Sequence, residues 1–91
     1  MDVFVALAHP VRRKVLAMLR KGPLCSGDIA AEFDVAWPTM TGHLKTLKDA
    51  GLVTAERSGT SIVYRLNATI LEETAAALLD IGSTINRRPK R

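Results

Sequence analysis

The sequence contains a single cysteine among its 91 residues, so it cannot form a disulfide within one chain. It has no apolar run near the roughly 18 residues that span a bilayer. Its N-terminus lacks a basic segment leading into a hydrophobic one, and internal repeats, linkers and low-complexity tracts are also missing. From these absences we expect one small cytoplasmic domain with neither a signal peptide nor a membrane contact.

A strong excess of charge is missing from most of the chain. There are 13 basic and 9 acidic residues, which gives a net charge of +4. The whole excess lies in Arg87, Arg88, Lys90 and Arg91, at the end of the sequence. Bulk charge is therefore weak evidence for nucleic-acid binding, and the position of each charge matters more. We expect residues 1–86 to form the folded domain and residues 87–91 a disordered basic tail.

Arrangements typical of enzymes are absent as well. The sequence offers no nucleophile–base pair, no paired carboxylates and no phosphate-cradling glycine loop. The candidate soft or borderline metal ligands, His9, Cys25 and His43, belong to three separate predicted elements, so we expect no metal site and no other cofactor. For Cys25 a buried apolar role is favoured over redox sensing, and both interpretations stay open.

Apolar residues are abundant, at 47% of the sequence. A chain of this size buries only about 60–65% of its unfolded surface, so it builds one small core. Apolar surface beyond what such a core hides suggests a partner, most simply a second copy of the chain. The residues expected at this dimer interface come from both ends of the domain: Val3, Phe4, Leu7, Leu71, Leu78 and Ile81.

Helical periodicity organises the first half of the chain. Apolar residues at positions 3, 4 and 7 predict a short first helix, and Pro10 suits the first turn of a second. Ser26 is the expected N-cap of a third helix. Pro38 is the expected first residue of a fourth, whose apolar positions are 40, 44 and 47 and whose C-cap is Gly51. The third and fourth helices, joined by about three or four residues, are typical of a helix-turn-helix.

Strand patterns follow at once. The segments 52–54 and 62–64 are rich in β-branched and aromatic residues, and the turn-forming residues 58–61 lie between them. Asn67 is the expected cap of a last helix. The predicted fold class is mainly α with a small β-hairpin: a dimeric winged helix-turn-helix of five helices and one two-stranded wing.

Three segments taken together resemble the ArsR-type winged-helix repressors over nearly the whole chain. They are AHPVRRKVLAML, GDIAAEFDVAWPTMTGHLKTLKDAGLV and SGTSIVYRLN. The SdpR-like autorepressor branch looks most similar. The resemblance implies a homodimer in which the first and last helices pair, and two recognition helices that meet successive major grooves of a palindromic operator. Control of the protein's own operon is one option that this branch suggests.

The expected DNA-binding residues lie on the recognition helix, about residues 38–50, and on the wing, about residues 57–61. They are Trp37, Pro38, Thr39, Thr41, Gly42, His43, Lys45, Arg57 and Ser61. Gly42 departs from the family, where a long polar residue is usual, so base readout is thinner here or the backbone approaches DNA closely. Trp37 has two interpretations of equal weight, a DNA contact or packing at the helix start. For His43, phosphate contact or a local hydrogen bond is favoured over metal binding. Arg57 and Arg65 are expected to flank the wing tip, and Arg57 is the favoured DNA contact of the two.

One alternative from another functional class stays open. A winged helix can serve as a protein–protein interaction module without reading DNA. Lys45 and Lys48 against Asp49 make the exposed helix face slightly basic, which favours double-stranded DNA. A gel shift with a salt titration discriminates the two functions. The sequence does not indicate an inducer, the operator or the regulated genes.

Overall fold

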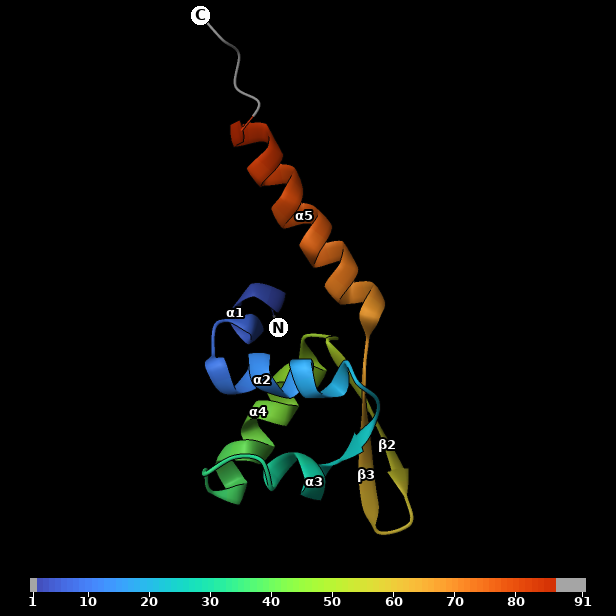
Figure 1. Cartoon of the computed structure of the whole chain (residues 1–91). Coiled ribbons are helices and arrows are strands. Elements are labelled where there is room, and N and C mark those ends of the chain that lie inside the picture. The colour runs from blue at the N-terminus through green and yellow to red at the C-terminus, as the bar shows by residue number, and fades with distance from the viewer. Residues whose placement is uncertain (1, 87–91) are drawn as a thin grey trace, which may run out of the picture.

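The computed structural model describes residues 2–86, and the expected tail at residues 87–91 lies outside this part of the chain. Within residues 2–86 the order is α1 (Val3–Leu7), α2 (Pro10–Leu19), β1 (Leu24–Cys25), α3 (Ser26–Ala30), α4 (Trp37–Asp49), β2 (Val53–Ser58), β3 (Ser61–Leu66) and α5 (Ala68–Asn86) (Figure 1). This order confirms the predicted helices and hairpin. None of the helices in the described residues is long and apolar enough to cross a bilayer.

The break between the first two helices lies where the sequence predicts it. The Asp2 carboxylate accepts a hydrogen bond from the Phe4 amide at 2.8 Å and so caps α1. Pro10 is the first residue of α2, where its missing N–H is not needed. The ring of His9 caps α2, because its Nδ1 accepts the Val11 amide hydrogen bond at 3.1 Å. This capping role gives His9 a structural function that the sequence alone did not indicate.

The helix-turn-helix differs in detail from the expectation. Cys25, not Ser26, is the N-cap of α3, and no side-chain hydrogen bond caps this helix. Helix α3 ends at Ala30, and tight bonds from the Glu32 and Phe33 amides to carbonyls three residues earlier turn the chain away. The connection to α4 therefore runs through residues 31–36 and is longer than the expected three or four residues.

Helix α4 has the expected apolar face and nearly the expected bounds. It begins at Trp37, so Pro38 takes the second helical position rather than the first. The second position also lacks an intrahelical acceptor for its N–H, so the proline fits there equally well. At the other end the C-cap is Ala50, not Gly51. Gly51 follows the cap at a φ of 79°, the left-handed conformation that ends many helices.

The wing belongs to a sheet of three antiparallel strands, in the order β1-β3-β2. The expected hairpin pairs Val53 with Leu66 at its base and Ser58 with Ser61 at its tip. Gly59 has a φ of 63° in the two-residue turn, a value that glycine adopts without a side-chain penalty. Strand β1 is not predicted by the sequence: Leu24 and Cys25 pair with Tyr64 and Val63, and a strand this short shows no periodicity.

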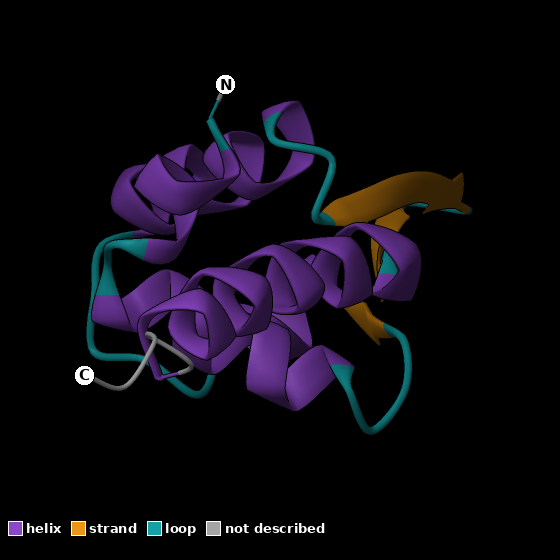
Figure 2. Ribbon diagram, turned by 90° about the horizontal axis from the view of Figure 1, so that it is seen from above, coloured by secondary structure: helices purple, strands orange, loops and turns teal. Residues whose placement is uncertain are grey.

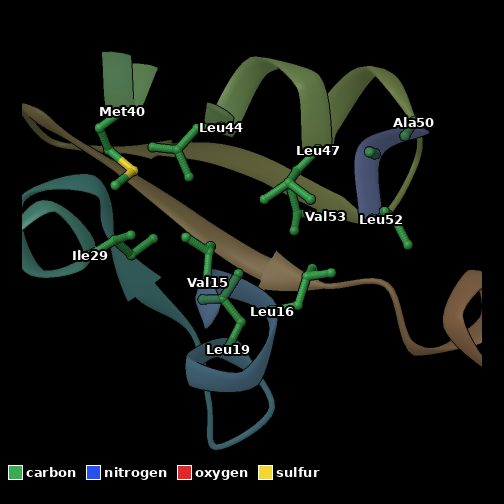
Figure 3. Packing of buried hydrophobic residues seen from close by; sticks show 11 residues of the cluster. Val15, Leu16, Leu19, Ile29, Met40, Leu44, Leu47, Ala50, Leu52 and Val53 are labelled. Atoms are coloured by element: carbon green, nitrogen blue, oxygen red, sulfur yellow. The ribbon is translucent and has the colours of Figure 1, made fainter. Parts of the chain in front are cut away.

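The core lies where α2, α3, α4 and the base of the sheet meet (Figure 3). Val15, Ile29, Met40 and Leu47 are fully buried at its centre. Figure 2 shows the strands gathered at one side of the helices. This packing fixes one face of α4 inside the molecule, so its opposite face points to solvent.

Helix α5 leaves this body soon after it begins and runs away from the other helices (Figure 1). Ile70 and Leu71 pack against the core. The Asn67 side chain donates a 2.9 Å hydrogen bond to the Gly51 carbonyl, so it ties the start of α5 to the end of α4. Beyond that junction the apolar residues of α5 are exposed, with Leu78 at 51%, Leu79 at 71% and Ile81 at 57%.

Candidate nucleic-acid interface

The exposed face of α4 is built from small and polar residues. Met40, Leu44 and Leu47 point into the core. The expected DNA-contacting residues on this helix other than His43 are all exposed: Trp37, Pro38, Thr39, Thr41, Gly42 and Lys45. An α-helix with such a face has the width and the donors that a major groove accepts. The structure thus brings these predicted residues together on one surface.

Gly42 has no structural reason to be glycine. It lies within α4, its φ is not positive, and a Cβ built there would have no atom within 4 Å. Glycine in a helix interior costs about 1 kcal/mol relative to alanine. The fold therefore gains nothing from this glycine, and its missing side chain leaves the exposed face open to a close approach from outside.

The polar groups beside Gly42 already have partners in the protein. The Thr41 hydroxyl donates to the Trp37 carbonyl at 3.0 Å, which leaves its oxygen to accept. The Lys45 ammonium lies 2.8 Å from an Asp49 carboxylate oxygen, one turn later on the same exposed surface. The hydrogen bond from Lys45 is the main cause that lowers the pKa of Asp49. One of the three hydrogens of the Lys45 ammonium goes to Asp49, and this carboxylate would lie beside a phosphate bound by Lys45.

Trp37 and Val35 form an exposed apolar corner at the start of α4. Trp37 is 52% exposed and Val35 is 37% exposed. The alternative in which Trp37 packs against its neighbours thus leaves about half of the residue in solvent. An apolar surface beside the helix start is suited to contact with a thymine methyl group.

His43 lies on the flank of α4 that faces α2, and it is half-buried. Its Nδ1 is 3.1 Å from an Arg12 guanidinium nitrogen, and its ring centroid is 4.4 Å from that of His9. Burial, then His9, then Arg12 lower the pKa of His43. The structure therefore separates His43 from the small polar face, and only its Nε2 is left for DNA.

The wing residues divide by strand face. Arg57 and Ser61 are exposed near the tip. Ser61 belongs to the last pair of the hairpin, with Ser58, and Arg57 belongs to the pair before it, with Ile62. Arg65 pairs with Thr54 near the base of the hairpin, so it does not flank the tip as expected. Because side chains alternate along a strand, Arg57 and Arg65 lie on opposite faces of the hairpin. Arg57 is the better placed of the two for a DNA backbone near the tip.

The basic cluster at the start of α2 has structural partners that sequence reasoning missed. Arg12 donates to the Ala6 and Val5 carbonyls at 2.7 and 3.1 Å. Arg13 donates to the Leu7 carbonyl at 2.7 Å, and the Lys14 ammonium lies 5.2 Å from the centre of the Phe33 ring. The arginine contacts satisfy the last carbonyls of α1 and hold it on α2.

No group of three or more His, Cys, Asp or Glu side chains gathers in the described residues. The close pair of His9 and His43 corrects the expectation that separate elements keep these ligands apart. Arg12 beside that pair disfavours a cation there. Cys25 is a half-buried free thiol on β1.

The residues expected at a dimer interface fall into two groups. Phe4, Leu78 and Ile81 are at least half exposed. Val3, Leu7 and Leu71 pack partly against the chain's own core. Two further exposed apolar residues on the same helices, Val5 and Leu79, were not predicted, although their type and their spacing along each helix could have indicated them. Helices α1 and α5 thus carry most of the exposed apolar surface.

Residues 9–55 match the family model described as bacterial regulatory protein, arsR family. The chain is 38% identical over 79 residues to the transcriptional repressor SdpR of Bacillus subtilis, a match that covers 87% of this chain and 88% of that protein. It is 44% identical over 65 residues to the HTH-type transcriptional repressor SmtB of Mycobacterium tuberculosis. That match covers 71% of this chain and 48% of the relative, so the chain spans about half its length.

Solved structures show the same fold. The crystal structure of an ArsR family transcriptional regulator has a TM-score of 0.86 with 29% identity, over 94% of this chain and 89% of that one. An ArsR-like transcriptional regulator from Rhodococcus has a TM-score of 0.79 with 31% identity, over 94% and 81% of the two chains. The likeness extends across helices, sheet and wing.

Proposed function

This chain belongs to the ArsR family of bacterial regulatory proteins and is a DNA-binding transcriptional repressor rather than an enzyme; we propose that it acts as a homodimer on a palindromic operator. The observation that carries this proposal is the exposed face of α4 with its small and polar residues, in a fold that also presents an exposed wing. With family membership established, the alternative of a protein-interaction module has no support.

In this proposal α4 enters the major groove with its N-terminal half. The Thr41 oxygen accepts a hydrogen bond from an exocyclic amine of adenine or cytosine, because its own proton goes to the Trp37 carbonyl. Trp37 contacts a thymine methyl, Gly42 admits the backbone close to the DNA, and Pro38 and Thr39 line the groove wall. Lys45, Arg57 and Ser61 bind phosphates.

Pairing of two copies follows from the exposed apolar residues of α1 and α5. Full burial of one leucine or isoleucine side chain contributes about 1.5–3 kcal/mol. The exposed side chains of α5 would gain this stabilisation only by packing against a partner: Leu78, Leu79 and Ile81. A two-fold axis through α1 and α5 would also place two α4 helices for two half-sites.

A gel shift against the chain's own upstream region, with a salt titration, tests the function. We expect the protein to shift that fragment. An unlabelled fragment of shuffled sequence should compete only weakly for the protein. The logarithm of the binding constant should fall with log salt by about 0.9 for each phosphate neutralised. Equal binding to both fragments would contradict recognition of a specific operator. If the protein bound neither the upstream fragment nor any other duplex at low salt, DNA binding itself would be contradicted.

A matched pair of variants separates base recognition from phosphate binding. Thr41→Ala should weaken operator binding more than binding to random duplex, because its oxygen reads a base edge. Lys45→Ala should weaken both alike and make the salt slope shallower by about one for each phosphate that is no longer neutralised. Equal effects of the two variants on both DNAs would contradict the assignment of Thr41.

A further inference from the structure

One guanidinium group connects the first helix to the recognition helix. Arg12 donates through Nε to the Ala6 carbonyl at 2.7 Å and through Nη2 to the Val5 carbonyl at 3.1 Å. Its third nitrogen, Nη1, lies 3.1 Å from Nδ1 of His43. The same planar group thus holds the end of α1 with two bonds and α4 with one.

The contact with His43 requires one form of the imidazole. Arginine keeps its charge and can only donate, so His43 must accept at Nδ1 and carry its proton on Nε2. A proton on Nδ1 would point an N–H at the guanidinium and break the contact. Among the described residues, His9 and Arg12 at the start of α2 are the titratable and charged groups that act on this ring.

We propose that Arg12 is a positioning residue of the DNA-binding surface, which fixes α4 against α1 through the neutral ring of His43. The proposal rests on the proposed function, since it assigns a cause to the orientation of the helix that enters the groove. Helix α1 also carries the exposed Phe4 and Val5, which the dimer proposal places against a second copy. Arg12 therefore links the interface between copies to the surface that reads DNA.

Acidification should weaken this arrangement. Burial, then His9, then Arg12 lower the pKa of the packed His43 ring from its ordinary value of 6.5. Well above pH 6.5 the ring is neutral whether it is packed or displaced, so the contact is intact. As pH falls below that value, a His43 ring that has left its packed position takes up a proton before the packed ring does. The packed arrangement therefore becomes steadily less stable until the pH reaches the lowered pKa of the packed ring. A histidine that contacts phosphate directly would show the opposite sign, because its protonation would strengthen DNA binding.

The first test compares two neighbouring arginines. Arg12→Lys keeps the charge but loses the fork that reaches both helices, and it should weaken operator binding by roughly three- to tenfold. Arg13→Lys is the matched control, because Arg13 also donates to a carbonyl of α1, at Leu7, and this bond does not involve α4. The control should bind within about twofold of the wild type. Equal losses in the two variants would overturn the assigned link to α4.

The second test uses pH, at fixed ionic strength, between about 5.5 and about 8. His43→Asn places a side-chain oxygen near the position of Nδ1 and cannot be protonated, so its operator affinity, whatever its value at neutral pH, should no longer fall on the acid side. His9→Asn keeps a good N-cap and removes one cause of the lowered pKa, so the acid-side weakening should be smaller and should end at a higher pH. Acid weakening that vanishes in His9→Asn, or wild-type binding that strengthens in acid and depends on His43, would overturn the proposal.

Thermal unfolding distinguishes failure of this inference from failure of the proposed function. Without any DNA, the wild type should lose stability below pH 6.5 more steeply than His43→Asn does. Identical pH profiles of unfolding would overturn the Arg12–His43 contact even if operator binding is found. A difference between the profiles would support the packed, neutral ring of His43 that the contact requires, even if the upstream fragment is not bound.

Discussion

At the scale of single residues, the glycine at position 42 makes helix α4 less stable than an alanine there would. Gly42 has room for a side chain, and its backbone is ordinary helix. Gly42→Ala should therefore raise the free energy of unfolding by up to about 1 kcal/mol in urea denaturation. The same variant should lower operator affinity in a gel shift if the helix backbone approaches the DNA as proposed.

A control for Gly42 exists on another helix. Gly82 in α5 is also helical, and a Cβ built there meets no atom within 4 Å. Gly82→Ala should raise the stability in the same way. Because Gly82 lies one turn after Leu78 in the proposed interface, light scattering checks that this variant still pairs, and its operator affinity should then be unchanged. Operator binding by Gly42→Ala that equals the wild type would show that the backbone does not come close to the DNA.

Asp49 should restrain DNA binding, because it holds Lys45 and places a carboxylate beside the expected phosphate. Asp49→Asn should therefore strengthen binding to operator and to random duplex alike. Glu72→Gln removes the same charge from α5 and serves as the control for net charge. The measurement is a binding isotherm for each variant at two salt concentrations. An equal gain from both variants would mean that net charge, and not the release of Lys45, is responsible.

At the scale of elements, the sequence predicted those parts that show a long period or a strong breaker. The apolar face of α4 and the Gly59 turn are such signals, and the structure confirms both. Strand β1 escaped prediction because two residues carry no alternation, and it exists only through pairing with β3. The early end of α3 depends on tight local bonds after Ala30 that no residue type announces.

The candidate site, too, has a part that the sequence predicted and a part that it did not. The exposed face of α4 followed from the positions of Met40, Leu44 and Leu47, since a helix with one buried face exposes the other. The partners of Arg12 could not be predicted, because its contact with His43 joins residues 31 positions apart. Such contacts depend on how α1, α2 and α4 pack, which periodicity along the chain does not specify.

The junction between α4 and α5 is a further element-scale feature, since Asn67 bonds to the Gly51 carbonyl across it. Asn67→Asp keeps the size of the side chain but loses the donor, so it should lower the free energy of unfolding by about 1 kcal/mol. Asn67→Ala should lose a similar amount. Urea denaturation provides the measurement, and stability of Asn67→Asp equal to the wild type would show that this bond does not hold the junction.

At the scale of the whole molecule, the unpaired faces of α1 and α5 predict a dimer. Leu78→Asp should give monomers in light scattering, because a buried carboxylate without a partner is costly. Ala31→Asp is a matched control: Ala31 is exposed and lies outside α1 and α5, so this variant should remain dimeric. A dimeric, fully stable Leu78→Asp would rule out this interface.

The position of α5 also bears on how long the protein survives in a cell. Much of this helix lies away from the core, and among the described residues a single copy holds it near its start, through Ile70, Leu71 and the Asn67 bond. Segments with few buried contacts open most readily, and proteases cleave open segments. Pairing as proposed would protect α5 more as the concentration of chains rises. The protein would thus be degraded faster at low concentration than at high concentration. When its concentration falls, the operator would then become free more abruptly than it would through dilution alone.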